Sequence, residues 1–509
     1  MENSSEKCRY CSSQTASSSS NVWIRCDACN EWCHAQCVGL DSKECDRIEQ
    51  YHCPQCLRRH GPSTYKPNVR KSQRERARLN YADLNNGKTA DQEIWKRILN
   101  AQTFAKDPFK RYQGSQVTLE LIRETGMREP FVIESPEGLD MQMPSQAITV
   151  NDIADAIGHD HPVEVMDVAT QSEVPNWTMG QWAKYYNDQD KDRTRNVISL
   201  EISDTKLAES IVRPRIVREL DWIDQVWPSS LKPNEYPKVQ LYCLMGIKDS
   251  YTDFHVDFGG SSVFYHVVKG SKVFYFIEPT TTNLRKYQKW SSSPDQSTTF
   301  FADEVKKCYA VHIKQGNTMI IPTGWIHAVY TPEDSLVIGG NFLHAMNIGA
   351  QLRVYDVEDA TKVPAKFRFP FYKRMNWYAA RYYHDLLLQA DQGTKSVLSK
   401  YELEGLNSLA QWLKKDIQSG SRKDIPHDIH DPSALLSQLI SMVENEMEKQ
   451  QIPKRKRSDS TDSLGNETDD HVKREGDDDD DDDLVREKLE TASLAKRRKS
   501  IGKEQTGAS

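Results

Sequence analysis

Long apolar runs are missing from this sequence of 509 residues. No stretch reaches the roughly 18 apolar residues in a row that a membrane-spanning helix needs. Residues 1–5 also lack the apolar core of a secretion signal. We therefore expect a protein of the cytosol or the nucleus, without a membrane partner.

Cysteine is nearly absent from most of the chain, because nine of the eleven cysteines come before residue 57. In a reducing compartment, this clustering favours metal binding over disulfide bonds. Zinc takes four cysteine or histidine ligands in a closed tetrahedral site, so eight ligands predict two zinc ions. A segment this short cannot build an adequate core without them. The ligands form four pairs, Cys8-x-x-Cys11, Cys26-x-x-Cys29, His34-x-x-Cys37 and Cys53-x-x-Cys56.

The order of these ligands, with Trp32 two residues before His34, resembles that of a plant homeodomain (PHD) finger. The resemblance implies interleaved ligation. The first and third pairs then bind one zinc ion, and the second and fourth pairs bind the other. Cys33 and Cys45 are left over.

Many PHD fingers bind trimethyl-lysine of the histone H3 tail in an aromatic cage, through cation–π attraction. Trp32 is at a position where the family has a cage wall, and Trp23 is a candidate second wall. Lys7 replaces the usual aromatic residue before the first cysteine. The alternative is that Trp32 only packs the finger and no methyl-lysine binds.

A His-x-Asp pair, His255 and Asp257, lies in an apolar stretch in the middle of the chain. Side chains two apart on a strand point the same way, so both can face one point. His327 lies alone in a second apolar stretch, 72 residues after His255. Two histidines and one carboxylate form the facial triad of non-haem Fe(II) oxygenases. Taken alone, a His-x-Asp pair is more often a structural histidine beside a solvated aspartate.

Short β-prone segments surround these residues at regular spacing. Such spacing predicts a double-sheet jelly roll of the cupin class, which binds a small ligand in the mouth of its barrel. The metal ligands would lie on neighbouring strands. The expected strands are residues 197–200, 263–268, 273–277, 318–322 and 336–340.

Several motifs in this region are similar to those of the JmjC histone lysine demethylases, above all the branch of histone demethylation protein 1 and its PHD-finger relatives. The likeness extends over roughly residues 78 to 385. It implies that Fe(II) is bound by His255, Asp257 and His327, with 2-oxoglutarate as cosubstrate. The motifs are residues 81–87, 137–141, 237–245, 251–260, 321–330, 339–344 and 368–372.

The far carboxylate of 2-oxoglutarate requires a cation and a hydroxyl group inside an apolar pocket. The resemblance assigns the cation to Lys272, although a lysine at a strand end is by itself more often solvated. It assigns hydroxyl groups to Thr252 and Tyr265 and places Asn196 in the pocket, with Asn341 as a weaker candidate. Thr252 has the opposite strand parity to the metal pair, so it needs a local bend to reach the pocket.

The same resemblance implies removal of methyl groups from mono- and dimethylated lysine 36 of histone H3 in the nucleus, with the nucleosome as partner. N-methyl hydroxylation would be followed by release of formaldehyde. Three alternatives stay open. They are the same chemistry on lysine 9 or lysine 27 of histone H3, hydroxylation of a protein side chain, and a non-catalytic chromatin reader.

The predicted fold class is a multi-domain α+β protein. Its parts are a PHD-type finger (5–59), a basic linker (60–80), a mixed α/β segment (81–190), the JmjC jelly roll or double-stranded β-helix (191–365), a helical region (366–450) and a disordered tail (451–509). Helices are expected at 91–105, at 150–157 with Thr149 or Asn151 as cap, and at 177–186, 377–388, 398–417 and 432–449.

The sequence contains two strongly charged segments, each with more than one possible function or charge pattern. Residues 58–78 carry eight Lys or Arg, which indicates either a strap for DNA phosphates or a solvated spacer. The tail contains the acidic run 477–483 and cannot bury a core. Its basic clusters 454–457 and 496–499 resemble nuclear localisation signals.

Overall fold

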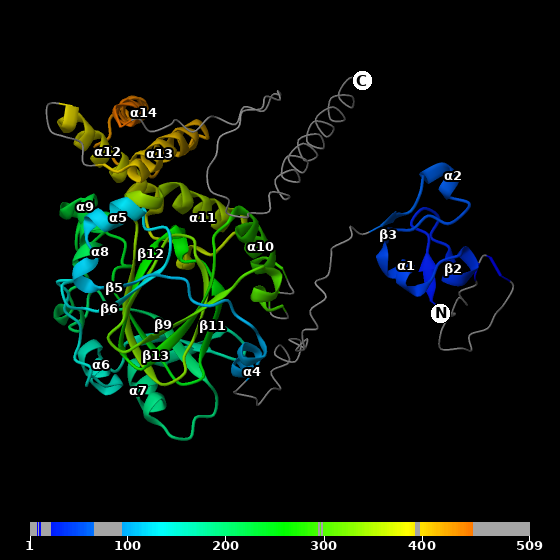
Figure 1. Cartoon of the computed structure of the whole chain (residues 1–509), viewed down its shortest axis with the longest axis horizontal. Coiled ribbons are helices and arrows are strands. Elements are labelled where there is room, and N and C mark those ends of the chain that lie inside the picture. Colours follow the sequence, from blue (N-terminus) through cyan, green and yellow to red (C-terminus); the bar gives the residue numbers. More distant parts are fainter. Residues whose placement is uncertain are drawn as a thin grey trace, which may run out of the picture. The chain divides into compact units, whose positions relative to one another are not determined.

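The computed structural model describes residues 8, 10–11, 22–65, 94–293, 296, 299–391 and 398–450. The chain divides into two compact units, residues 1–78 and 79–509, which we describe separately (Figure 1). Most of the predicted basic linker, the motif at 81–87 and the whole tail, with its acidic run and basic clusters, lie outside the described residues. None of the described helices combines the length and apolar character that a membrane crossing requires.

The first unit is a small, cysteine-centred module. Its buried core consists of Cys8, Cys26, Cys33, Tyr51 and Cys53, with a thin layer of partly buried residues around them. So little apolar surface cannot hold a fold by itself. Its elements are β1 (Trp23–Arg25), β2 (Trp32–His34), α1 (Ser42–Arg47), β3 (Ile48–Gln50), α2 (Leu57–His60) and β4 (Thr64–Tyr65).

The second unit is built on two facing antiparallel-rich sheets, as a jelly roll requires. The larger sheet has the order β5-β6-β15-β12-β17-β10-β9-β7-β8, and the smaller has the order β11-β16-β13-β14. The strands are β5 (Arg111–Gln113), β6 (Phe131–Ser135), β7 (Pro162–Asp167), β8 (Ser172–Thr178), β9 (Arg195–Glu201), β10 (Tyr242–Gly246), β11 (Tyr251–His255), β12 (Ser262–Lys269), β13 (Ser271–Ile277), β14 (Tyr309–Lys314), β15 (Thr318–Ile321), β16 (Ile326–Tyr330) and β17 (Ser335–Phe342).

Alternate residues of the central strands enter different apolar clusters, because successive strand side chains point to opposite faces. On β13, Phe274 and Phe276 point into the cluster between the sheets. Val273 and Tyr275 point outward, where α4 (Ile94–Ala101) and α10 (Thr281–Ser291) cover the small sheet. The outer face of the large sheet is covered by α5 (Leu119–Thr125), α6 (Val150–Ile157), α7 (Met179–Asn187) and α8 (Arg215–Leu220).

A helical region follows the last strand and lies together near one end of the barrel (Figure 1). Its apolar faces share one cluster with Trp222 of α9 (Trp222–Gln225) and with Leu343 just after β17. The region is therefore packed onto the barrel. It comprises α11 (Ile348–Ala360), α12 (Tyr372–Asp391), α13 (Lys400–Gln418) and α14 (Pro432–Lys449).

Several sequence expectations differ from the structure at element ends. The predicted helix 177–186 begins at Met179, because Thr178 is its N-cap and accepts the N–H of Gln181, while Trp177 stays on β8 opposite Val163. The predicted helix 91–105 ends at Ala101, and Ala105 instead forms a bridge to Tyr309. Helix α5 was not expected, although Thr118 caps its start and Gly126 its end.

The packing of the helical region generates a stability prediction. Leu406 of α13 is fully buried, whereas Leu388 of α12 is 46% exposed. Leu406→Ala should lower the free energy of unfolding by about 3 kcal/mol, because it removes a buried side chain and leaves a cavity. Leu388→Ala is the matched control and should cost less than about 1 kcal/mol. Urea denaturation of the full chain measures both; equal losses would contradict the packing.

Candidate metal centres

The pairing of β11 with β16 brings the first candidate centre together. His255, the last residue of β11, lies directly opposite His327 of β16. Asp257 follows two residues after His255, at the start of the turn 258–260. One donor atom from each of the three side chains lies within 4.8 Å of the other two, and His327 Nε2 is 4.0 Å from Asp257 Oδ2.

Backbone carbonyls orient both imidazoles. His255 Nδ1 is 2.8 Å from the carbonyl oxygen of Asp253, and His327 Nδ1 is 3.0 Å from that of Trp325. A carbonyl oxygen only accepts hydrogen bonds, so each Nδ1 carries the proton and donates it. Each Nε2 therefore keeps its lone pair, which is the arrangement that metal-binding histidines use.

The electrostatics of this group favour a cation at its centre. Burial raises the pKa of the Asp257 carboxyl group, against the opposing effects of His255 and of a hydrogen bond from Asn341. Burial, reinforced by His255, lowers the pKa of His327 well below its ordinary value. A divalent ion would offset the cost of a buried carboxylate and would bind neutral imidazole. The donor set therefore fits Fe(II).

The predicted cosubstrate residues lie on strands of both sheets. The pairing of β11 with β16 shifts in register between Thr252 and His255, which is the local irregularity that Thr252 was expected to need. Asn196 of β9 donates its side-chain N–H to Thr252 Oγ1 at 3.4 Å. Tyr265 lies in the cluster between the sheets, where burial raises the pKa of its hydroxyl group.

Lys272 has a buried side chain, unlike a solvated lysine at a strand end. Its side chain has only 3% exposure, and its Nζ donates to Thr331 Oγ1 at 2.7 Å. Burial lowers the pKa of Lys272 to about 7. A Cβ atom at residue 246 would lie 2.7 Å from Lys272 Nζ, so Gly246 leaves the room that this side chain needs.

Sequence reasoning missed Thr331 and Gly246. Thr331 lies beyond the end of β16, and Gly246 ends β10, so neither shares a motif with Lys272. The pairing of β13 with β16, which puts Val273 opposite Tyr330, brings Thr331 beside Lys272, and the approach of the two sheets brings Gly246 there. Local sequence carries no signal for such a contact.

A cavity of about 960 Å³ opens beside the His255, Asp257 and His327 group. His255 and Asp257 line it together with Tyr242, Tyr287, Asn341 and Glu358. Asn341, the weaker candidate from the sequence, donates to Ser261 Oγ at 2.9 Å and also hydrogen bonds Asp257. The cavity is large enough for a long side chain to approach the metal site from outside.

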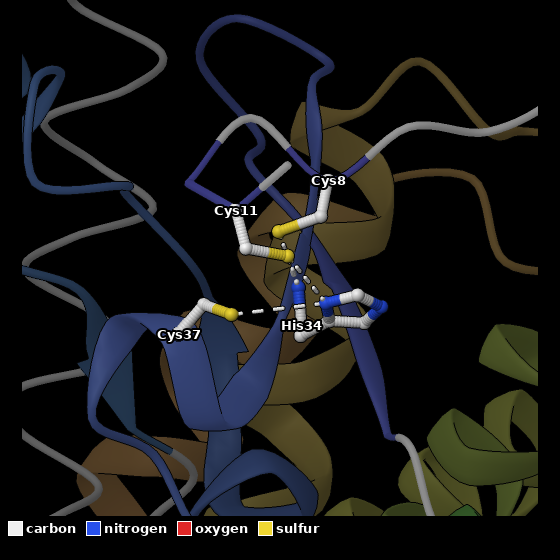
Figure 2. A group of neighbouring side chains, drawn as sticks. All are labelled: Cys8, Cys11, His34 and Cys37. Carbon is white, nitrogen blue, oxygen red and sulfur yellow. Dashed lines mark hydrogen bonds between the residues drawn. The ribbon is translucent and has the colours of Figure 1, made fainter. Parts of the chain in front are cut away.

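The zinc-finger side chains form the two interleaved groups that the PHD resemblance implies. One group is Cys8, Cys11, His34 and Cys37, and the other is Cys26, Cys29, Cys53 and Cys56. Figure 2 shows the first group, in which the sulfur atoms and His34 Nδ1 face one point. Cys33 and Cys45 belong to neither group. The assignment of these side chains as zinc ligands stays a prediction.

Their spacing matches the edges of a zinc tetrahedron. With Zn–S bonds of about 2.3 Å, two sulfur ligands lie roughly 3.8 Å apart, and Cys29 Sγ and Cys53 Sγ are 3.9 Å apart. His34 Nδ1 lies 3.3 Å from Cys11 Sγ and 3.7 Å from Cys37 Sγ. These short distances make Nδ1 the metal-facing atom of His34, and Nε2 is buried without a partner among the described residues.

The thiol chemistry of Cys53 also suits zinc. Burial alone would raise the pKa of this thiol. The neighbouring Tyr10 hydroxyl group and the backbone N–H groups of Cys56 and Gln55 lower the pKa to about 6. The thiolate, which is the form that binds zinc, is therefore accessible near neutral pH.

The two tryptophans considered for histone reading have different surroundings. Trp23 packs against the ring of His34 with 4.0 Å between ring centroids. Trp32 is half-buried, and the guanidinium group of Arg25 lies 6.0 Å from its ring centroid. A role of Trp23 and Trp32 in binding methyl-lysine stays a prediction.

Comparison with known proteins gives matches over most of the chain. Residues 242–342 match the family described as "JmjC domain, hydroxylase", and residues 346–451 match the "Jumonji helical domain". The chain is 40% identical to "JmjC domain-containing histone demethylation protein 1" of Yarrowia lipolytica, over 83% of this chain and 84% of that protein.

Two animal proteins are also similar. "Histone lysine demethylase PHF8" of Danio rerio is 37% identical over 86% of this chain and 43% of its own length. "Lysine-specific demethylase 7A" of Mus musculus is 38% identical over 85% of this chain and 46% of its own length. The chain thus spans less than half of these two proteins.

The cysteine groups generate a metal prediction. Wild-type protein should contain two zinc ions per chain, and Cys26→Ser should lose at least one of them together with the fold of the finger, since the finger depends on its metals. Cys45→Ser is the control and should keep both ions. Elemental analysis measures zinc, and circular dichroism measures folding. Full zinc content in a folded Cys26→Ser variant would contradict the assignment.

Proposed function

The chain belongs to the family of JmjC domain-containing histone demethylation proteins, and on that premise we propose that it removes methyl groups from lysine 36 of histone H3 in its mono- and dimethylated forms. Fe(II) would be bound by His255, Asp257 and His327, with 2-oxoglutarate as cosubstrate. The observation that carries the proposal is the convergence of these three donors, with both histidine tautomers fixed by the backbone.

Different residues would bind the cosubstrate and the methylated lysine. Fe(II) with 2-oxoglutarate and dioxygen supplies the hydroxylation of the N-methyl group, and the hydroxylated amine then releases formaldehyde. Lys272 and the hydroxyl groups of Thr252 and Tyr265 would bind the far carboxylate of the cosubstrate, with Asn196 orienting Thr252. The cavity beside Asp257 would receive the methylated lysine. The protein's main contribution is position, because the cosubstrate and metal carry the chemistry.

The choice of lysine 36 rests on resemblance to one branch of the family. Support comes from the match to the Yarrowia lipolytica protein of that branch, which is aligned over most of both chains. The names of the animal relatives specify no histone residue. Lysine 9 and lysine 27 of histone H3 are therefore the outcomes that a direct substrate test must separate.

The proposed setting is the nucleus, with the histone H3 tail and the nucleosome as partners. The names of the relatives as histone demethylases support it. The finger would add a second contact with the histone tail, for which Trp32 is the partly exposed candidate. A contact of the basic linker with DNA stays a prediction, because most of that segment lies outside the described residues.

A library of methylated histone H3 peptides tests this function. With Fe(II) and 2-oxoglutarate, the wild-type protein should convert lysine 36 peptides to lower methylation states and release an equal amount of formaldehyde, measured by mass spectrometry and a formaldehyde assay. His255→Ala should lower the rate by at least about 100-fold, because it removes a metal ligand. His312→Ala, which changes an exposed histidine of β14, should keep the wild-type rate.

Each other outcome points elsewhere. Reaction only on lysine 9 or lysine 27 peptides would reassign the substrate. A mass gain of one oxygen without formaldehyde would indicate a side-chain hydroxylase, and binding without reaction would indicate a reader. Full activity in His255→Ala would contradict the metal site.

The buried lysine generates a pH prediction. In the free protein the pKa of Lys272 is lowered to about 7 by burial, so the side chain is mostly neutral above that pH. Binding of an anionic cosubstrate favours the ammonium form and therefore takes up a proton. The dissociation constant of 2-oxoglutarate should rise by up to about tenfold per pH unit above pH 7.

Calorimetry with Mn(II) in place of Fe(II), in two buffers of different ionisation enthalpy, measures this proton uptake. Lys272→Met should bind 2-oxoglutarate more weakly and lose the pH dependence. Affinity of the wild-type protein that stays constant from pH 7 to pH 9 would exclude Lys272 as the titrating partner.

A further inference from the structure

The segment that carries two of the three candidate iron ligands is supported from outside the barrel by helix α11. Glu358, in the last turns of α11, is a buried residue with 8% of its surface exposed. It accepts the backbone N–H of Gly259 at 2.7 Å. Gly259 lies two residues after Asp257, in the turn 258–260 that leads from the iron ligands into β12.

The turn and the helical region approach each other so closely that side chains do not fit between them. Gly259 has φ +60° and Gly260 has φ +62°, a conformation that favours glycine. A Cβ atom at Gly259 would lie 2.7 Å from Phe369 Cβ, and one at Gly260 would lie 2.7 Å from Gln351 Cα. The turn is thus pressed against α11 and the segment before α12, and its position depends on theirs.

A second outside support acts nearby. The backbone of Val256, between His255 and Asp257, hydrogen bonds the hydroxyl group of Tyr287 on α10. Tyr287 and Glu358 both line the cavity beside the iron ligands. The strand end and the turn that present the ligands are therefore anchored at two points by residues outside the two sheets.

From this geometry we propose that Glu358 is a positioning residue of the iron site, which places Asp257 by accepting the N–H of Gly259. The inference rests on the proposed function, because it concerns the same metal site. It makes the Jumonji helical region part of the metal centre, since α11 belongs to that region. Residues that orient metal ligands typically change metal affinity about 10- to 100-fold when they are altered.

Glu358 needs an acceptor oxygen to hold the N–H of Gly259, but it does not need a negative charge. Burial raises the pKa of Glu358 to about 7, and a neutral carboxyl or amide carbonyl accepts a hydrogen bond as well. Three variants separate these properties. Glu358→Gln keeps an acceptor without the charge, Glu358→Asp keeps the charge on a side chain one methylene shorter, and Glu358→Ala keeps neither.

The experiment measures the affinity of the full, zinc-loaded chain for Mn(II) in the presence of 2-oxoglutarate, by electron paramagnetic resonance. Mn(II) is the probe because it prefers oxygen and nitrogen ligands to thiolates. Glu358→Ala and Glu358→Asp should raise the dissociation constant about tenfold or more, and Glu358→Gln should stay within about twofold of wild type. Asp359→Asn is the matched control. It changes a neighbouring carboxylate whose side chain is 71% exposed, and it should match wild type.

The outcomes are distinct. Wild-type affinity in folded Glu358→Ala and Glu358→Asp variants would overturn the inference, as would a loss in Glu358→Gln with retention in Glu358→Asp. If Glu358→Ala does not fold, the comparison of the Gln and Asp variants decides. The His255→Ala variant distinguishes a failure of the proposed iron site from a failure of the role of Glu358. If Mn(II) affinity is unchanged in His255→Ala, the proposed function is contradicted. If His255→Ala loses Mn(II) affinity but the Glu358 variants keep it, only this inference is contradicted.

Discussion

The antiparallel pairing of β11 with β16 is the interaction on which the candidate catalytic site depends. It places His255 opposite His327, although the two residues are 72 positions apart in the chain. The same ladder contains a register shift between Thr252 and His255, which is the local irregularity that Thr252 would need to face the same side as the His255–Asp257 pair. If this ladder slipped by one residue, each strand would present its other face, and the three metal donors would no longer meet.

Two ionisable side chains near this ladder lie largely out of water. Lys272 is buried and the Asp257 side chain is 16% exposed, and burial shifts the pKa of each in the direction that favours its neutral form. Isolated buried charges are costly, and they are usually compensated by a metal, a counter-ion or a change of protonation. A divalent cation beside Asp257 and a carboxylate beside Lys272 would compensate both. The charges of these two side chains would thus be complementary to a divalent cation and an anionic cosubstrate.

The finger is also arranged around candidate metal ligands, but here these ligands form most of the core. Its core is mostly cysteine, and Cys29 Sγ and Cys53 Sγ lie at the separation of two ligands in a tetrahedral zinc site. Apolar burial is too small there to specify a fold, so metal coordination would supply the organising interaction. In the second unit the apolar clusters are large, and metal coordination would add function to a fold that packing already establishes.

Ligand types, local periodicity and turn chemistry were readable from the sequence alone, because they depend on neighbours in the chain. The Cys and His spacing indicated two tetrahedral groups, and the β-prone segments indicated the barrel strands. Of the two caps expected for α6, Thr149 and Asn151, Thr149 is the N-cap and the helix begins at Val150. The family resemblance pointed to Lys272, which in isolation would have been taken for a solvated side chain. Only the tertiary structure decided that Gly246 and Thr331 surround the Lys272 amine, and that Glu358 reaches Gly259 across 99 residues. Such contacts arise when distant strands pair and when separate sheets and helices pack against each other, and no local pattern encodes the distance between them.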